Sequence, residues 1–478
     1  MVFSSPIFLF LFLPLVLGVY LLLPRRAWNL WLLIASLFFY AWGEKLYTLI
    51  MLASISVNYV FGLLIEQQRG RPAMKPVMAA AVVVNLLLLI GFKYANFLVN
   101  SLNAVLSPFG VSPLQLAPVH LPIGISFFTF HALSYVIDVY RADARGQKNF
   151  VRVALYVTLF PQLIAGPILR FHQVADQFVS RHIDLPLFAA GVRRFLVGFA
   201  KKVLIANTLA IPADALFGVA PATLSSGAAW LGIICYTLQI YFDFSGYTDM
   251  ALGLGNMFGF HFPENFNYPY ISKSIREFWR RWHISLSTWF RDYLYIPLGG
   301  NRVSPARNYF NLITVFFLCG LWHGASWTFV IWGLYHGLFL IIEHSAFARW
   351  LERRPRFLTH IYALSVVIVG WVLFRADTLT HALGYLQAMI GLRNTSQPAY
   401  TLLALHFNPA VGLALVAGIL GSAPWIKSLG ARLDSLTLHP AVRIGMESLV
   451  NAALLLMFFV ALTQLAAGTY NPFIYFRF

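Results

Sequence analysis

One uncharged stretch constrains the fold of this chain more than any other feature, because no formally charged residue occurs between Arg307 and Glu343. An apolar run of this length can cross a bilayer. It nevertheless contains His323 and, further along, His336. An ionisable ring at membrane depth is costly, so it usually faces a functional site or a water-filled cavity. The alternative is a histidine that hydrogen-bonds a neighbouring helix as a structural contact.

His323 is the stronger functional candidate of the two histidines. On a straight helix, with about 100° per residue, His336 would point roughly 140° away from His323. The two rings are therefore not expected to share a site by local geometry. Gly320, Gly324 and Ala325 keep the backbone near His323 uncrowded, as close helix packing or a substrate passage requires.

Composition places the chain among polytopic membrane proteins of the all-α class. Of its 478 residues, 59% are hydrophobic and only 11% are charged, whereas a soluble domain carries about a quarter. Lys and Arg outnumber Asp and Glu by 34 to 17, which indicates cytoplasmic loops and contact with anionic membrane lipid. The basic residues lie in short loops between apolar spans, so nucleic acid is not an expected partner. Cys235 and Cys319 sit inside apolar runs and support neither a disulfide framework nor a zinc site.

The first part of the chain predicts five crossings with the N-terminus outside. The expected spans lie near 7–23, 28–42, 46–65, 77–95 and 122–139. Arginines follow the first and third spans, and the positive-inside bias assigns those loops to the cytoplasm. The stretch 100–120 is uncharged and contains three prolines, which suits an external loop.

Beyond Asn149 the regular alternation breaks down. The stretch 153–166 is apolar but short, which predicts a re-entrant or buried piece. The basic positions from Arg193 to Lys202 predict a helix near the inner interface. We expect roughly ten to twelve transmembrane helices plus re-entrant and interfacial helices in one integral membrane domain. Its expected parts are outer helices at about 1–119, a motif-bearing core at about 120–345 and C-terminal helices at about 346–478.

Three further stretches concentrate polar residues within apolar surroundings. Asp243 and Asp249 interrupt an apolar run, where pairing with basic side chains is favoured over acid–base chemistry. The stretch 276–302 is rich in arginine and tryptophan, which suits an interfacial helix or an anionic, nucleotide-bearing cofactor. The hydroxyls and His131 of the stretch 121–131 are a weak signal, because such groups commonly join helices.

Missing motifs narrow the function classes. The chain has no Walker A loop, no Rossmann glycine fingerprint, no H-E-x-x-H and no G-x-S-x-G, so ATP-driven transport, metalloprotease and serine-hydrolase chemistry lack their parts. A polysaccharide or lipid-carrier transporter remains the competing class. It would predict internal repeats and broken helices in corresponding halves, which the sequence does not display.

The longest motifs resemble those of the membrane-bound O-acyltransferase (MBOAT) family. The resemblance rests on R-E-F-W-R-R-W-H-I-S-L-S-T-W-F-R-D-Y-L-Y-I-P-L-G-G-N-R, followed by L-W-H-G-A-S-W-T-F-V-I-W-G. M-V-F-S-S, P-I-G-I-S-F-F-T-F, F-P-Q-L-I-A-G-P-I, Y-F-D-F-S-G-Y-T-D-M and P-F-I-Y-F-R-F fit the same bacterial branch. That branch contains the alginate O-acetylase membrane subunits and the teichoic-acid D-alanylation proteins. The resemblance covers essentially the whole chain.

The resemblance implies an O-acetyltransferase with two catalytic positions. The family's characteristic histidine falls on His323, and the second position maps onto the segment of His283. Acyl transfer from a thioester needs a base near neutral pH, and histidine is suited to that role. An activated thioester requires neither ATP nor a metal, and no permanently bound cofactor is expected.

The resemblance also implies where the acyl group comes from and goes to. The donor arrives from the cytoplasm, and acetyl-CoA is preferred over a carrier protein because its phosphates suit arginine-rich surroundings. The acetyl group crosses the bacterial inner membrane to periplasmic acetyltransferase partners that modify an exported, alginate-like polysaccharide. D-alanyl transfer is the alternative within the family. The residues expected at the donor are Arg276, Arg280, Arg281, Trp282, Arg291, Asn301 and Arg302.

Overall fold

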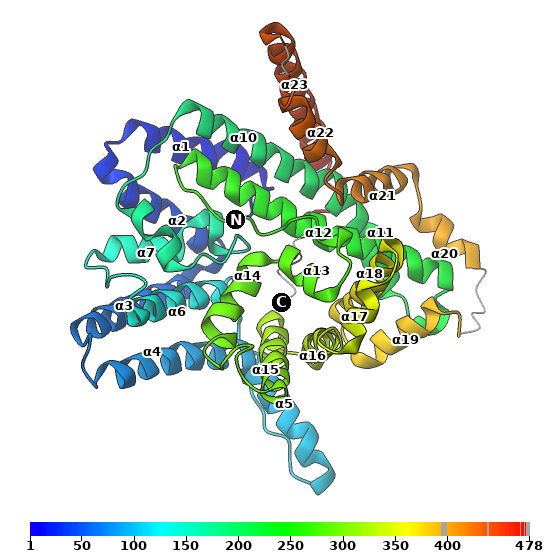
Figure 1. Cartoon of the computed structure of the whole chain (residues 1–478), viewed down its shortest axis with the longest axis horizontal. Helices are drawn as coiled ribbons and strands as arrows, with labels where there is room; N and C mark the ends of the chain where they lie inside the picture. The colour runs from blue at the N-terminus through cyan, green and yellow to red at the C-terminus, as the bar shows by residue number, and fades with distance from the viewer. Residues whose placement is uncertain (393–398, 437–438, 469, 473, 475–478) are drawn as a thin grey trace. The chain divides into compact units, whose positions relative to one another are not determined.

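A computed structural model describes residues 1–392, 399–436, 439–468, 470–472 and 474. Every regular element within these residues is a helix (Figure 1), which confirms the all-α prediction. Most of the terminal motif P-F-I-Y-F-R-F lies outside the described residues. The chain divides into two compact units. The first comprises Met1–Gly191, Leu254–Pro263 and Gly324–Ser326, and the second Val192–Gly253, Glu264–His323 and Trp327–Phe478.

The first unit is built from the apolar runs of the N-terminal part. Its helices are α1 (Leu13–Leu22), α2 (Trp28–Glu44), α3 (Thr48–Gln67), α4 (Met74–Leu89), α5 (Ala95–Leu106), α6 (Ile125–Arg141), α7 (Phe150–Thr158), α8 (Phe160–Leu163) and α9 (Phe171–Val174). A π-helical turn precedes α1, and another joins α4 to α5. These bounds reproduce the predicted positions of the first five apolar spans to within a few residues.

The interior of the first unit is dominated by aromatic rings. The ring of Phe160 in α8 lies 5.3 Å from that of Phe12 and 5.6 Å from that of Phe39. All four residues of α8 are buried, so the stretch 153–166 forms short buried helices rather than a crossing, as its length indicated. Asn58 and Asn85 exchange two hydrogen bonds between α3 and α4, which satisfies two buried amides.

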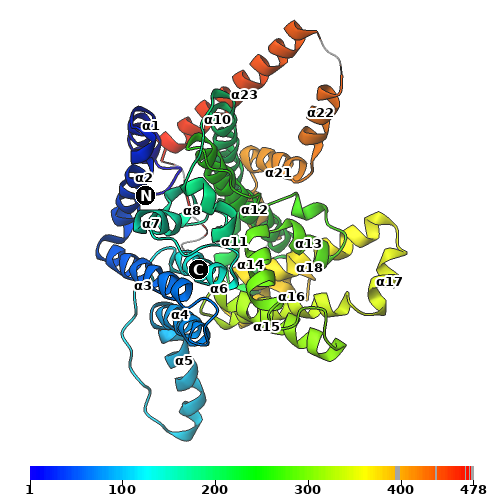
Figure 2. The ribbon, with the colours of Figure 1, turned by 60° about the vertical axis from the view of Figure 1, so that its left-hand side comes forward.

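The segment expected to be an external loop is partly helical. Helix α5 continues to Leu106, and only the later part is irregular. The irregular part returns along α5 (Figure 2), where Asn103 accepts from the Leu114 amide and Asn96 accepts from the Val119 amide, both at 2.9 Å. The loop prediction for 100–106 is therefore wrong, because side-chain amides on the helix supply partners for the returning backbone.

The second unit contains the remaining helices. They are α10 (Leu185–Ala200), which begins in the first unit, α11 (Asn207–Gly218), α12 (Ser226–Met257), which ends in the first unit, α13 (Ile275–Arg281), α14 (Ile284–Phe290), α15 (Pro305–His323), α16 (Trp327–Ile342), α17 (Ala346–Glu352), α18 (Arg356–Arg375), α19 (Leu379–Met389), α20 (Ala399–His406), α21 (Pro409–Gly421), α22 (Trp425–Asp434) and α23 (Pro440–Ala466).

Buried ion pairs fix α12 in the second unit. Asp249 contacts Lys201 at 2.6 Å and Arg194 at 2.9 Å, while Asp243 pairs with Lys202. Both carboxylates thus have the structural partners that the sequence favoured. Lys202 is only 2% exposed, and Asp243 compensates its buried charge. The placement of this basic stretch near the inner interface stays a prediction.

Among the described residues, five helices are long and apolar enough to cross a membrane. The count rises to seven if each of two bent helix pairs is one span. One of the five, Arg25–Gln67, combines α2 and α3, which the sequence treated as separate spans. Length and composition alone define this count. The chain is a multi-pass membrane protein, and the number of ten to twelve crossings stays a prediction.

Helices α15 and α16 form an antiparallel pair that ends at the main functional candidate. The two helices lie side by side in both views (Figures 1 and 2). A side chain at Gly320 would collide with the Phe329 carbonyl, and one at Gly333 with the Phe316 carbonyl. Small residues thus permit the close approach. The chain breaks between His323 and Trp327, so the single straight helix assumed for comparing His323 with His336 does not exist.

Candidate active site

His323 ends α15 inside a shell of aromatic rings. Its ring centroid lies 4.9 Å from those of Trp322 and Trp332, and 5.2 Å from that of Phe374. It borders a cavity of about 10 Å³, which we call the His323 cavity. That volume admits about one water molecule. The lining is Ile240, Phe244, Trp282, His323, Trp332, Trp371, Phe374 and Ile474, so His323 is its one titratable side chain among the described residues.

His336 lies on the other side of Trp332. The Trp332 ring is 4.9 Å from His323 and 5.2 Å from His336. His336 packs instead against Trp279, at 5.3 Å, and close to Gly370. The two histidines therefore do not share a cavity, as expected, although the reason is an intervening indole and not helix periodicity.

His283 lies in the turn between α13 and α14 and is fully buried. Its Nδ1 is 3.2 Å from Oδ1 of Asn265. That Asn265 atom also accepts the Ser285 backbone N–H at 3.0 Å, which identifies it as the amide oxygen. His283 must therefore donate from Nδ1, and its Nε2 is left as the basic nitrogen. Nε2 makes no hydrogen bond among the described residues.

The two expected catalytic positions are neighbours separated by one indole. The Trp322 ring lies 5.9 Å from His283 and 4.9 Å from His323. His283 does not border the His323 cavity, but its neighbour Trp282 does. Burial lowers the pKa of His283 to about 3, so its ring stays neutral near pH 7. The arrangement offers one basic nitrogen on each side of Trp322.

A second, larger cavity lies beside the arginine-rich stretch. It has a volume of about 540 Å³, and we call it the arginine cavity. It is lined by four of the expected donor residues, namely Arg276, Arg280, Arg291 and Asn301. Ser287 of α14 and Cys319 of α15 also border it. Its volume falls within the range of about 300–1,000 Å³ typical of small-molecule sites.

The other expected donor residues lie elsewhere. Arg281 donates to Glu277 at 2.9 Å and to the Asn267 carbonyl at 3.0 Å, so it stabilises α13. Trp282 borders the His323 cavity. Arg302 is exposed and does not line the arginine cavity. Helix α13 presents Arg276 and Arg280 to the cavity because they lie one turn apart.

Two tryptophans separate the cavities. Trp279 borders the arginine cavity and lies 5.8 Å from Trp332, which borders the His323 cavity. Cys319, which borders the arginine cavity, lies one helical turn before His323 on α15. The arginine cavity and His323 therefore meet the same helix, with the indoles of Trp279 and Trp332 between the two cavities.

Sequence reasoning missed several residues that build the site. Asn265, which fixes the tautomer of His283, lies far from it in the chain and carries no local signal. Glu343 accepts the backbone N–H groups of Ile275 at 2.6 Å and Arg276 at 2.9 Å, and so fixes the start of α13. As a charge that ends a long apolar run, Glu343 could have been found from the sequence.

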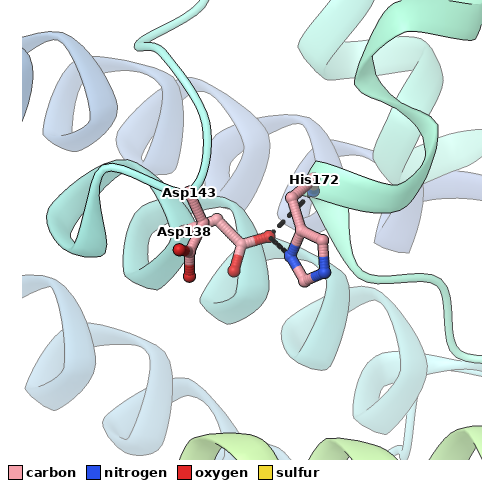
Figure 3. A group of neighbouring side chains, drawn as sticks. All are labelled: Asp138, Asp143 and His172. Carbon is pink, nitrogen blue, oxygen red and sulfur yellow. Dashed lines mark hydrogen bonds and ion pairs between the residues drawn. The ribbon is translucent and has the colours of Figure 1, made fainter.

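The first unit holds a separate group of polar side chains, drawn in Figure 3. Ligand atoms of Asp138, Asp143 and His172 lie within 4.8 Å of one another. Buried Asp138 accepts from both the backbone N–H and Nδ1 of His172 at 2.9 Å. These bonds fix the first turn of α9, and they account for Asp138 without a cation. The absence of a bound metal stays a prediction.

A helical membrane protein that keeps a base out of water beside an arginine-lined cavity has the architecture of an enzyme that transfers a group within the bilayer. The model of the membrane-bound O-acyltransferase family matches residues 36–381. The chain belongs to this family and is an acyltransferase.

Relatives cover the chain from end to end. It is 47% identical over 501 residues to the probable alginate O-acetylase of Azotobacter vinelandii, with 100% of both chains covered. It is 51% identical over 390 residues to the Pseudomonas aeruginosa protein of the same name, covering 81% of this chain and 75% of that one. A peptidoglycan O-acetyltransferase of Helicobacter pylori is 38% identical, with 83% of this chain and 81% of that protein covered.

Asn265→Ala removes the acceptor of His283 Nδ1, of the Ser285 N–H and of the Ser285 hydroxyl. Loss of the bond to His283 alone, worth about 1.4 kcal/mol, should reduce acyl transfer about tenfold. Asn265→Asp keeps the acceptor and should retain most of the activity. Its carboxylate favours the protonated ring, so the acid limb of the activity profile should move to higher pH. Rates of purified wild type, Asn265→Ala and Asn265→Asp, measured from pH 8 down to the region of about pH 3 where the wild-type ring becomes protonated, test this. An Asp variant as inactive as the Ala variant would indicate a purely structural role.

Proposed function

We propose that this chain is the membrane component of a polysaccharide O-acetylation system. It takes an acetyl group from acetyl-CoA on the cytoplasmic side of the inner membrane and passes it to an acceptor on the periplasmic side. His323 is the proposed general base. The end product is an acetylated exported polysaccharide, with an alginate-like polymer favoured by the names of the relatives.

The single observation that carries this proposal is that the arginine cavity lies one helical turn from His323 on α15. The arginine cavity begins among Arg276, Arg280 and Arg291 and reaches Cys319, one turn before His323. Guanidinium groups bind phosphate with forked hydrogen bonds. The phosphates of CoA are thus accommodated among arginines, while the acyl thioester extends toward the histidine.

The proposed reaction needs only a base and a dry site. An acceptor hydroxyl loses its proton to His323 and attacks the thioester carbonyl carbon. The C–S bond then breaks, an ester forms, and the proton passes to the departing thiolate to give free CoA. The aromatic lining of the His323 cavity leaves room for about one water molecule, which limits hydrolysis of the thioester.

The proposed orientation follows the charges of the loops. We assign to the cytoplasm the connections that contain Arg25, Arg26, Arg69 and Arg71, because cytoplasmic loops carry an excess of basic residues. The N-terminus is then periplasmic. The irregular part after α5 then faces the periplasm. Phe109 and Leu114 are 77% and 53% exposed there, and exposed apolar residues at a protein rim suit a docking partner. That partner is a periplasmic acetyltransferase.

Reconstitution tests the proposal. The purified chain in nanodiscs, given acetyl-CoA and polymer, should release CoA slowly and leave the polymer unmodified. Addition of the periplasmic acetyltransferase should produce acetylated polymer, measured by transfer of radiolabelled acetyl groups. Heat-treated partner protein is the control.

Two outcomes would contradict the proposal in different ways. Efficient acetylation of the polymer by the chain alone would show that the polymer enters the membrane site directly, which excludes the relay. Turnover with an acylated carrier protein but not with acetyl-CoA would reassign the donor.

A further inference from the structure

A third cavity of the second unit has no role in the proposed reaction. It has a volume of about 330 Å³ and lies where α13, α17 and α18 begin; we call it the Lys273 cavity. Its charged lining residues are Lys273, Arg276, Glu343, Glu352, Arg354 and Arg356. Four cations therefore face two carboxylates. Arg276 also borders the arginine cavity, so the two cavities lie on either side of that side chain.

Among the residues that the structure describes, neither carboxylate forms an ion pair with any of these four cations. Glu343 is 3% exposed, and its oxygens accept from two α13 backbone amides and from the Tyr362 hydroxyl. Within the described residues, the side chains of Lys273 and Arg356 make no ion pair or hydrogen bond. Arg354 instead stacks its guanidinium 4.4 Å from the ring centre of Trp350. An anion entering the cavity would meet a net positive lining and two cationic side chains, Lys273 and Arg356, that are not held in ion pairs.

The position of the cavity identifies it as a membrane-boundary site. Arg356 is the first residue of the apolar candidate span α18. The axes of α16 and α17 differ by 76°, and α17 begins at this cavity. Such a bend is expected where a chain leaves the hydrocarbon region. Trp350 is 48% exposed beside the cavity, and tryptophan is enriched at membrane interfaces.

Apolar residues continue from the charged cavity along α18. Phe357, Leu358 and Ile361 are 63%, 44% and 55% exposed. A small soluble phosphate ester has no apolar chain that could contact these residues, whereas a glycerophospholipid has both a phosphate and acyl chains. The site combines basic residues with an exposed apolar helix face, which is the chemistry of lipid-headgroup recognition.

We propose that the Lys273 cavity binds the headgroup phosphate of an anionic glycerophospholipid, with Lys273 and Arg356 holding the phosphate and the first turn of α18 contacting the acyl chains. The lipid stabilises the α16–α17 bend beside the start of α13, which carries Arg276. This site is separate from the proposed acetyl transfer and does not depend on it.

Lipid binding by the full-length chain tests the proposal. Purified protein in a neutral detergent is titrated with phosphatidylglycerol or phosphatidylcholine, and bound lipid is counted by native mass spectrometry. Wild-type protein should retain phosphatidylglycerol selectively. Each basic residue contributes roughly fivefold in affinity at an anionic lipid surface. The double variant Lys273→Gln/Arg356→Gln should therefore bind roughly 25-fold more weakly.

Matched variants separate the site from general charge. Lys427→Gln/Arg432→Gln makes the same chemical changes at exposed positions of α22 and should bind phosphatidylglycerol like wild type. Lys273→Arg/Arg356→Lys keeps both charges and should also bind. An equal loss in the α22 variant, or full binding by the double glutamine variant, would overturn the proposal.

Competition distinguishes the source of the phosphate. Glycerol 1-phosphate and acetyl-CoA should not displace the bound lipid. Displacement by glycerol 1-phosphate would mean that the cavity takes free phosphate esters, and displacement by acetyl-CoA would assign it to the acyl donor. Either result would overturn the lipid assignment.

Discussion

Replacement of His323 by alanine is expected to abolish acyl transfer while leaving the protein inserted in the membrane. Removal of a general base lowers rates by about 10²- to 10⁴-fold. No other described residue that lines the His323 cavity can accept a proton, so no neighbour substitutes for the lost ring. Acetylation of the exported polymer in cells carrying His323→Ala, together with the amount of protein in the membrane fraction, measures the effect.

His336→Ala is the matched control, because His336 packs against the other face of Trp332. It should retain much more activity than His323→Ala at a comparable protein level. Fully acetylated polymer in the His323→Ala strain, with normal insertion, would refute the assignment of the base. Equal inactivity of both variants would place the two rings in one catalytic unit.

Filling the arginine cavity is expected to have the second largest effect. Ser287 is half-buried on α14 and borders this cavity. An indole at this position occupies space that the proposed donor would need, and misplacing a reacting group by about 1 Å can cost on the order of a hundredfold in rate. Ser287→Trp should therefore reduce acetyl-CoA turnover roughly hundredfold in the reconstituted system.

Ser287→Ala provides the control, since it removes the hydroxyl without filling the space. It should turn over acetyl-CoA at close to the wild-type rate. Direct binding of radiolabelled acetyl-CoA should be lost in Ser287→Trp and kept in Ser287→Ala. Normal turnover by a stable Ser287→Trp protein would show that the donor does not use the arginine cavity.

Some of the site could be predicted from local sequence because burial of charge is so costly in a bilayer. His323 stood out as the ionisable residue in a charge-free run, and Asp243 and Asp249 were expected to need basic partners for the same reason. In the structure, Asp243 forms an ion pair with Lys202, and Asp249 forms ion pairs with Lys201 and Arg194. Which lysine or arginine would pair with each carboxylate was not readable, because the partners lie on another helix.

The arginine-rich stretch was only partly interpretable. Its density indicated an anionic ligand, and Arg276 and Arg280 do face one cavity. Arg281 is instead held by Glu277, four residues earlier. That spacing on a helix favours a local ion pair and could have been weighed against ligand binding. Arg302 had no comparable local signal.

The helical, multi-pass character of this protein could be inferred from the sequence alone, because the cost of burying charge and unpaired backbone in lipid acts on every residue locally. The same cost singled out His323 as a candidate. The end of α15 at His323 and the position of Trp332 between His323 and His336 are visible only in the folded structure. The same holds for the hydrogen bond by which Asn265 fixes the basic nitrogen of His283. These features depend on contacts between distant segments, and no local free-energy cost specifies which distant partner a side chain will meet.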